Sequence, residues 1–387
     1  MSENTFVTSQ SWISRLGGSI KGIFFGILMI IGAMILLWWN EGRAVKTAKG
    51  LDQGLEEVIQ VEGGKALPEN NGKLVYVSGK VETTDTLTDE LFGIKERVLR
   101  LKRNVEMYQW SEYSESKKRK KIGGGEETTV TYKYKQIWSP SLINSSNFKT
   151  IEGHQNPGTM PFANYDNIAA TASLGDFNLP NSLKNRLNTF EVQSINKLDT
   201  IALPNGKIIN DGVNSYAYIG QGALGAPSVG DIKVDFKTVP MGNYSIVSKQ
   251  LGKTFEAFTT NTNTSINLID AGTVSSESMF QSAIQSNKIM TWILRVIGFF
   301  LIYGGFSMIL KPLVIIGDLI PFVGSIINFG TSIVSGLVAL SLSLFVIAIA
   351  WIFYRPILGV SLLVIAAGVG YYLFKKAKEK KTPNPSI

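Results

Sequence analysis

The chain has 387 residues, a net charge of +8, one histidine (His154) and no cysteine. The lack of cysteine excludes disulfides and thiolate metal sites, and the single histidine excludes mechanisms that need two histidines or a histidine–cysteine pair. Positively charged residues are concentrated at 117–121 and 375–381, and apolar residues are concentrated at 20–39 and 292–374. The positive charge therefore indicates segments that flank a membrane rather than a nucleic-acid partner.

The first predicted element, after a short tail at residues 1–19, is a membrane-spanning helix at residues 20–39. About 20 helical residues cross a hydrocarbon core of about 30 Å, and the Trp38 and Trp39 pair at its end is typical of a membrane interface. A cleaved signal peptide is the alternative. The apolar core is too long for one, no small-residue cleavage site follows, and helical spacing of apolar residues continues to Ile59, so an uncleaved anchor is favoured.

Residues 40–290 predict a soluble, strand-rich domain. Residues 74–82 are typical of a strand, and period-two alternation at 98–110 and 129–138 predicts a long hairpin. The predicted hairpin tip, residues 114–126, carries five consecutive basic residues: Lys117, Lys118, Arg119, Lys120 and Lys121. A solvated loop is the favoured interpretation, and a contact with acidic lipid headgroups or a protein partner is the alternative.

Further strands are expected at residues 214–220, 231–238 and 242–250, with a short helix near 183–190. A helix at 276–290 continues into the next membrane span. Because strands and helices are segregated along the chain, the pattern favours an α+β domain.

The domain offers no convincing catalytic or cofactor site. Residues 220–225 match the dinucleotide pattern GxGxxG, but Ala226 and Pro227 follow, where the pattern needs a helix to meet the pyrophosphate. His154 is expected to fix a turn, because the sequence indicates no partner or cleft for a general base. No carboxylates show metal-ligand spacing. We therefore expect no enzyme activity, no cofactor and no metal.

The C-terminal part predicts three more spans, at residues 291–310, 330–353 and 356–374, followed by a basic tail at 375–387. The first of these is expected to stop at Lys311 and Pro312. Residues 311–329 are interrupted by Asp318, Pro321 and a glycine, which favours an interfacial or re-entrant segment. If this segment crosses the membrane instead, the count becomes five and the C-terminus changes sides.

Six residues of this part are candidates for a membrane function: Asp318, Pro321, Ser341, Ser343, Arg355 and Pro356. Asp318 is expected at the cytoplasmic interface, where it could cap a helix, and a functional role at membrane depth is the alternative. Ser341 and Ser343 are expected to hydrogen-bond to their own helix or a neighbouring one, and a pore lining is the alternative.

The topology follows from the number of spans and the basic flanks. Four spans place both termini on one side, and Arg15, Lys21, Lys311 and the basic tail all fall on that side. The positive-inside rule makes it cytoplasmic, and the domain at 40–290 is then expected across the membrane.

Several motifs, in order along the chain, resemble the transmembrane protein 43 (LUMA) family. They include residues 40–48 (NEGRAVKTA), 68–75 (PENNGKLV), 105–110 (VEMYQW), 153–157 (GHQNP) and 353–356 (FYRP). Thr291, Trp292, Arg295 and Trp351 also fall at family-like positions. The residues singled out by this resemblance are Asn40, Glu41, Gly42, Arg43, Glu106, Tyr108, Trp110, His154, Asn156, Pro157, Asp318, Pro321, Arg355 and Pro356.

The resemblance implies four spans and a large lumenal domain between the first two. It implies self-association, partners among membrane lipids and membrane proteins, and no enzymatic activity. A non-catalytic scaffold that organises membrane protein complexes or maintains the envelope is the expected function, and an oligomeric ion channel is the alternative. The cysteine-free chain is expected to be a bacterial member in the cytoplasmic membrane; a eukaryotic member would lie in the endoplasmic reticulum or inner nuclear membrane. Gly304, Gly305 and Gly336 would allow close helix approach on self-association.

Overall fold

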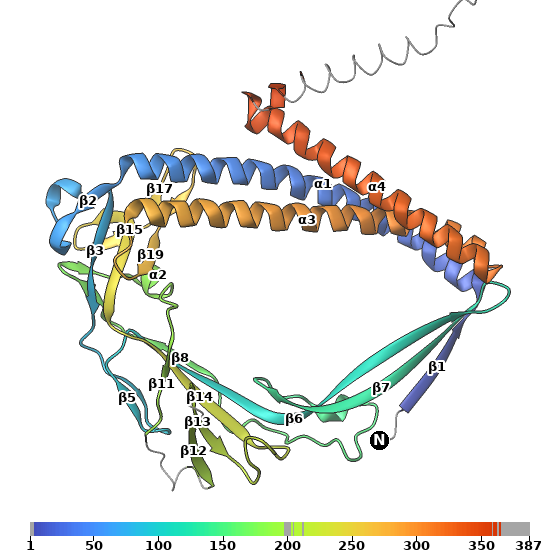
Figure 1. The fold of residues 1–387 in the computed structure, drawn as a ribbon, viewed down its shortest axis with the longest axis horizontal. Coiled ribbons are helices and arrows are strands. Elements are labelled where there is room, and N and C mark those ends of the chain that lie inside the picture. Colours follow the sequence, from blue (N-terminus) through green and yellow to red (C-terminus); the bar gives the residue numbers. More distant parts are fainter. Residues whose placement is uncertain are drawn as a thin grey trace, which may run out of the picture. The chain divides into compact units, whose positions relative to one another are not determined.

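The computed structural model describes residues 4–196, 203, 205–210, 213–357, 359–361 and 364 (Figure 1). The chain forms two compact units. We call residues 1–8, 50–118 and 128–282 the strand-rich unit, and residues 9–49, 119–127 and 283–387 the helical unit. Two long helices and two long strands contribute residues to both units.

Three long helices dominate the helical unit: α1 (Trp12–Glu57), α3 (Ser276–Gly317) and α4 (Pro321–Tyr354). Each contains an apolar stretch that is long enough to cross a membrane, because about 20 helical residues suffice. The predicted spans at 20–39, 291–310 and 330–353 lie within these helices. The predicted span at 356–374 lies almost entirely outside the described residues, and so does the basic tail.

Glycines set the contact between α1 and α3, which run side by side in the helical unit (Figure 1). A Cβ atom at Gly26 would lie 2.7 Å from the Gly305 carbonyl oxygen, and one at Gly304 would lie 2.7 Å from the Met29 side chain. Small residues let helix backbones approach closely in a membrane. Gly304 and Gly305 thus serve a contact within one chain, so they do not by themselves indicate self-association.

The helix of the second predicted span does not end at Lys311 and Pro312 as expected, because α3 continues through Pro312 to Gly317. A proline removes one backbone hydrogen bond, and membrane helices tolerate that loss where other contacts hold the helix. The chain turns at residues 318–320 and α4 begins at Pro321, where a missing N–H group is not needed. Residues 311–329 are therefore the end of α3, a turn and the start of α4, rather than a separate helix. Their position at the membrane interface stays a prediction.

The strand-rich unit contains two main sheets. One has the strand order β1-β7-β6-β14-β13-β12, with β8 and β11 added, and the other has the order β19-β15-β16-β10-β9-β3-β2. The strands are β1 (Asn4–Gln10), β2 (Ile59–Val61), β3 (Leu74–Glu82), β4 (Leu87–Asp89), β5 (Ile94–Glu96), β6 (Arg100–Lys120), β7 (Glu126–Ser139), β8 (Tyr165–Ile168), β9 (Ser173–Leu174), β10 (Phe177–Asn178), β11 (Glu191–Gln193), β12 (Gly206–Asn210), β13 (Ser215–Ile219), β14 (Ile232–Val239), β15 (Gly242–Leu251), β16 (Thr254–Glu256), β17 (Phe258–Thr259), β18 (Ser265–Ile266) and β19 (Leu268–Ala271). The short helix α2 spans Asn181–Lys184.

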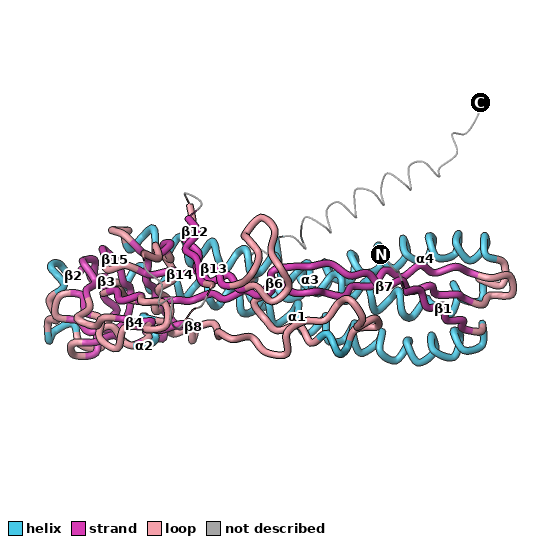
Figure 2. The backbone as a smooth tube through the Cα atoms, turned by 90° about the horizontal axis from the view of Figure 1, so that it is seen from below, coloured by secondary structure: helices cyan, strands magenta, loops and turns pink. Residues whose placement is uncertain are grey.

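The predicted long hairpin is present as β6 and β7, which Figure 2 shows as neighbouring strands joined by a loop. The apolar face of β6 is buried as the alternation indicated, and it pairs with β14, so that Val105 lies opposite Val234 and Met107 opposite Ile232. The loop at 121–125 is shorter than the predicted tip, because the strands continue to Lys120 and resume at Glu126. We call residues 119–127 the hairpin end.

Candidate functional site

The motif at residues 40–43 lies in the middle of α1, directly after Trp38 and Trp39. Asn40 and Glu41 are fully buried. An unpaired carboxylate in an apolar helix destabilises the protein. The groups around Glu41 therefore indicate its role.

Glu41 is paired by two other membrane helices. Arg295 of α3 donates two hydrogen bonds to its carboxylate, from Nε to Oε1 at 2.6 Å and from Nη2 to Oε2 at 2.9 Å. Trp351 of α4 donates from Nε1 to Oε2 at 2.8 Å. The Arg295 guanidinium also lies 4.8 Å from the centre of the Trp292 ring. This bidentate geometry is strong and directional. One carboxylate therefore links three helices.

The flanking residues of the motif make a second set of interhelical contacts. Arg43 donates to the Asn287 side-chain oxygen at 2.9 Å and to the Thr291 hydroxyl at 3.1 Å. Asn40 donates to the Thr291 carbonyl oxygen at 3.0 Å, and Asn287 donates to the Ala44 carbonyl oxygen at 2.9 Å. We call Asn40, Glu41, Arg43, Asn287, Thr291, Arg295 and Trp351 the polar junction.

Gly42 leaves space for an aromatic ring. A Cβ atom at this position would lie 2.6 Å from Cζ of Tyr354, at the end of α4. The sequence singled out the first half of the polar junction but did not include Asn287, Arg295 or Trp351 among its site residues. Thr291, Arg295 and Trp351 had been noted only as family-like positions, and nothing local indicated that they pair with the motif.

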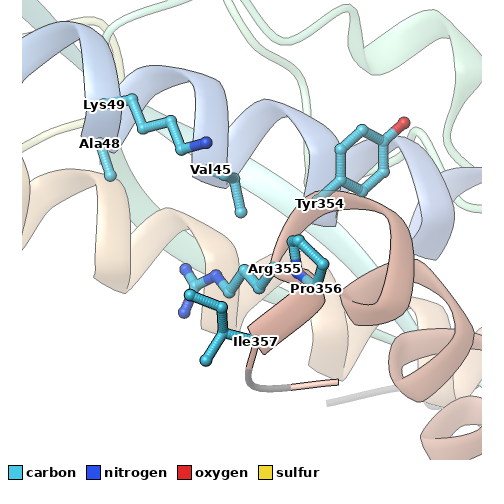
Figure 3. A pocket seen from close by; sticks show the side chains of 7 residues that line it. All are labelled: Val45, Ala48, Lys49, Tyr354, Arg355, Pro356 and Ile357. Atoms are coloured by element: carbon cyan, nitrogen blue, oxygen red, sulfur yellow. The ribbon is translucent and has the colours of Figure 1, made fainter. Parts of the chain in front are cut away.

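A cavity of 530 Å³ begins at Val45, one helical turn after Glu41, and Figure 3 shows its lining. We call it the interface pocket; it is lined by Val45, Ala48, Lys49, Tyr354, Arg355, Pro356 and Ile357. Its walls come from α1, from the last residue of α4 and from the segment that follows α4. Lys49 and Arg355 form no salt bridge with any carboxylate of the described residues. The pocket thus combines apolar walls with two cations.

Asp318 lies in the turn between α3 and α4 and is fully buried. Arg15 of α1 donates from Nη2 to Oδ2 at 2.7 Å, and Lys120 of the hairpin end donates from Nζ to Oδ1 at 2.5 Å. Trp12 donates to the Ile315 carbonyl oxygen at 2.8 Å. We call Arg15, Lys120 and Asp318 the Asp318 cluster. Two cations thus neutralise Asp318. Their contacts link the start of α1 and the turn after α3 to the hairpin end.

The Asp318 cluster bears on membrane topology. The charge pattern placed Arg15 on the cytoplasmic side and residues 40–290, which include Lys120, on the other side. A salt bridge requires that Arg15 and Lys120 lie on one side of the membrane. In the structure both cations bind the Asp318 carboxylate, so Arg15 and the hairpin end lie together. This disagrees with the expectation that the membrane separates Arg15 from residues 40–290.

The other basic and membrane candidates have separate surroundings. Lys117, Lys118 and Arg119 are exposed on β6, and Lys121 forms a salt bridge of 2.6 Å with Glu127. Ser341 is exposed on α4 and Ser343 is buried there. The hydrogen bond expected for Ser343 is absent, because its buried hydroxyl has no partner among the described residues.

The family-like residues of the domain form a structural joint in the strand-rich unit. Asn156 bonds the Trp110 backbone in both directions, at 2.7 and 2.9 Å. The His154 ring stacks on Tyr134 with ring centres 3.8 Å apart, and its backbone N–H donates to the Ile151 carbonyl oxygen in a turn. These contacts join the loop after β7 to β6.

The remaining three family-like residues of the domain also pack locally. Glu106 forms a salt bridge of 2.7 Å with Lys233, and the Tyr108 ring lies 5.3 Å from the Trp138 ring. Pro157 lies close to Gly230. None of these contacts forms a catalytic arrangement.

The glycine-rich loop at 220–225 binds a side chain of its own unit. The Asp231 carboxylate accepts hydrogen bonds from the backbone N–H groups of Gln221, Gly222 and Ser228, at 3.0, 3.1 and 2.7 Å. It also accepts one from the Tyr218 hydroxyl at 2.5 Å, and burial raises the pKa of Tyr218. No helix follows the loop, so its amides hold a carboxylate rather than a nucleotide phosphate.

Comparison with known proteins identifies the family. The family model described as Transmembrane protein 43 matches residues 107–356. The human protein named Transmembrane protein 43 is 30% identical over 361 residues, which cover 90% of this chain and 88% of the human one. The mouse protein of that name is 30% identical over 369 residues (92% and 90%), and the fruit-fly homologue (Drosophila melanogaster) is 27% identical over 350 residues (89% and 91%).

No solved structure matches the chain. These relatives are animal proteins and lend no support to the expected bacterial origin. The matches and the three apolar helices identify a membrane protein. The chain belongs to the transmembrane protein 43 family.

Proposed function

We propose that this membrane protein is a non-catalytic scaffold that organises other membrane proteins, and that its strand-rich unit provides the binding surface. The observation that carries the proposal is the Glu41 carboxylate, which α3 and α4 hold with three hydrogen bonds. A buried ion pair of this kind fixes the arrangement of helices rather than supplying a reactive group.

The chemistry of the described residues supports this reading. Glu41 and Asp318 are each occupied by cations of the same unit. Asp231 is saturated by backbone amides and a tyrosine. In the part of the chain that the structure describes, no three His, Cys, Asp or Glu side chains gather where they could hold a metal ion. The charged groups stabilise the fold and leave the surfaces free for binding.

No specific observation favours the channel alternative. A channel would need polar groups along a path through an oligomer, and the best membrane candidate, Asp318, is buried and neutralised within one chain. Exposed apolar side chains such as Phe24, Ile31 and Phe300 instead offer surfaces for lipids or other membrane helices.

Quantitative cross-linking in native membranes tests the scaffold proposal. The tagged wild-type chain is expected to give a reproducible set of cross-linked membrane proteins, and Arg295→Leu is expected to lose most of them while still inserting. Lys288→Gln serves as the control, because Lys288 is an exposed cation of α3 outside the polar junction. The scaffold proposal fails if the wild type cross-links no more proteins than an unrelated membrane protein does. If the purified chain also conducts ions in planar bilayers, the channel function takes its place.

A further inference from the structure

The interface pocket combines two features that ordinary core packing does not need. Its walls are mostly apolar, from Val45, Ala48, Pro356 and Ile357, and two cations stand beside them. A volume of 530 Å³ lies within the usual range for a small-molecule site, about 300–1,000 Å³. The ligand that fits must therefore present both a negative charge and an apolar part.

Neither cation forms a salt bridge within the part of the chain that the structure describes. Arg355 is half-buried directly after the last residue of α4, and Lys49 is exposed on α1. The polar junction nearby shows the opposite situation, because its arginine Arg295 is matched to a carboxylate. In the view of Figure 3, Lys49 and Arg355 stand on either side of Val45. An anion between them would supply the missing negative charge.

The position of the interface pocket relative to the apolar helices indicates the source of that anion. Val45 follows Glu41 by one helical turn, and Arg355 follows Trp351 by one turn, which is about 6 Å along each helix axis. The tryptophans Trp38, Trp39, Trp292 and Trp351 gather before this level on the three helices, as is typical of a membrane interface. The headgroup layer adds about 5–8 Å to each side of the hydrocarbon core, so the pocket lies at headgroup depth.

We propose that the interface pocket binds one anionic glycerophospholipid. Arg355 and Lys49 contact its headgroup phosphate, and Val45, Ala48 and Ile357 contact the beginning of its acyl chains. A phosphatidylcholine headgroup brings a positive charge that meets the two cations unfavourably, whereas phosphatidylglycerol keeps its full negative charge. The pocket is therefore selective for net-negative headgroups. This proposal does not depend on the scaffold function.

The sequence motifs of the family resemblance meet at this pocket. Residues 40–48 supply Val45 and Ala48, and residues 353–356 supply Tyr354, Arg355 and Pro356. Gly42 contributes indirectly, because its missing side chain admits the Tyr354 ring, which precedes Arg355. Two segments about 300 residues apart in sequence thus form one site. The motif at residues 40–48 holds α3 and α4 in place with its first half and lines the pocket with its second half.

Native mass spectrometry of the full-length chain in a mild detergent tests the proposal, with phosphatidylglycerol and phosphatidylcholine of identical acyl chains as probes. We expect the wild type to retain one phosphatidylglycerol with clear preference over phosphatidylcholine. Each cation near an anionic headgroup contributes roughly a fivefold gain, so Lys49→Gln/Arg355→Gln should weaken phosphatidylglycerol binding by roughly 25-fold. Inorganic phosphate at the same concentration should not displace the lipid, because it lacks the acyl chains.

Two further variants distinguish binding in the interface pocket from a general attraction of anionic lipids to surface cations. Lys288→Gln/Lys311→Gln removes the same charge from exposed positions of α3 and should leave binding unchanged. Ala48→Phe keeps both cations but places a ring in the interface pocket against its apolar wall, and it should weaken retention of phosphatidylglycerol at this site. The proposal fails if the α3 double variant loses as much binding as the pocket double variant, if Ala48→Phe binds like the wild type, or if the wild type retains both lipids equally. Unfolding temperatures confirm that each variant is folded.

Discussion

Removing the cationic partner of Glu41 tests the role of the polar junction directly. Arg295→Leu deletes two hydrogen bonds, of 2.6 and 2.9 Å, and leaves a fully buried carboxylate with only the Trp351 donor. Breaking a buried pair by removing one partner destabilises a protein by about 3–5 kcal/mol. We expect a loss in this range, because Glu41 has no access to solvent that could replace the arginine.

The double variant Glu41→Leu/Arg295→Leu gives the sharper test. It removes the stranded charge along with its partner, and well-packed apolar residues in place of a buried ion pair are often neutral or stabilising. The double variant is therefore expected to be more stable than Arg295→Leu alone, by about 2 kcal/mol or more. Glu41→Leu alone is expected to cost less than Arg295→Leu, because Arg295 keeps a contact with the Trp292 ring and is partly exposed.

The assay is reversible unfolding in detergent micelles, followed for the wild type, both single variants and the double variant. Glu106→Gln serves as control, because its salt bridge with Lys233 is partly exposed and should contribute less than about 1 kcal/mol. Additive effects of the two single variants would refute the reasoning, since they would mean that Glu41 and Arg295 do not depend on each other.

Three further outcomes are expected. Single cysteines introduced at Ser14 and Ile122 into this cysteine-free chain should react with an impermeant thiol reagent from the same side of the membrane, and labelling from opposite sides would show that the Asp318 cluster does not form there. Gly42→Ala should lower the unfolding temperature, because its methyl group would overlap the Tyr354 ring and overpacking costs about 1–3 kcal/mol. Burial raises the pKa of Tyr218 in the folded state, so the free energy of unfolding should keep its full value below a pH of about 10 and decrease as the pH rises above it. In denaturant titrations the Tyr218→Phe variant should lack this part of the decrease, and an unchanged pH dependence would contradict the expectation.

Some of this protein could be read from local sequence. The apolar stretches at 20–39, 291–310 and 330–353 predicted long apolar helices, and each lies within a helix that is long and apolar enough to cross a membrane, because hydropathy sums over one segment. The strands expected at 74–82, 214–220, 231–238 and 242–250 are present as β3, β13, β14 and β15. Each of these properties is carried by a window of adjacent residues.

The partners of the buried charges were decided only by tertiary structure. Glu41 is 254 residues from Arg295, and Asp318 is 303 residues from Arg15. Nothing in a local window distinguishes a paired carboxylate from a pore-lining one, and Asp318 therefore looked like a membrane candidate until its two cations were located. The same limit applied to Pro312, which lies inside α3 although a proline usually ends or kinks a helix. Hydropathy and periodicity act locally and fix elements, whereas charge pairing depends on which distant segments the folded chain brings together.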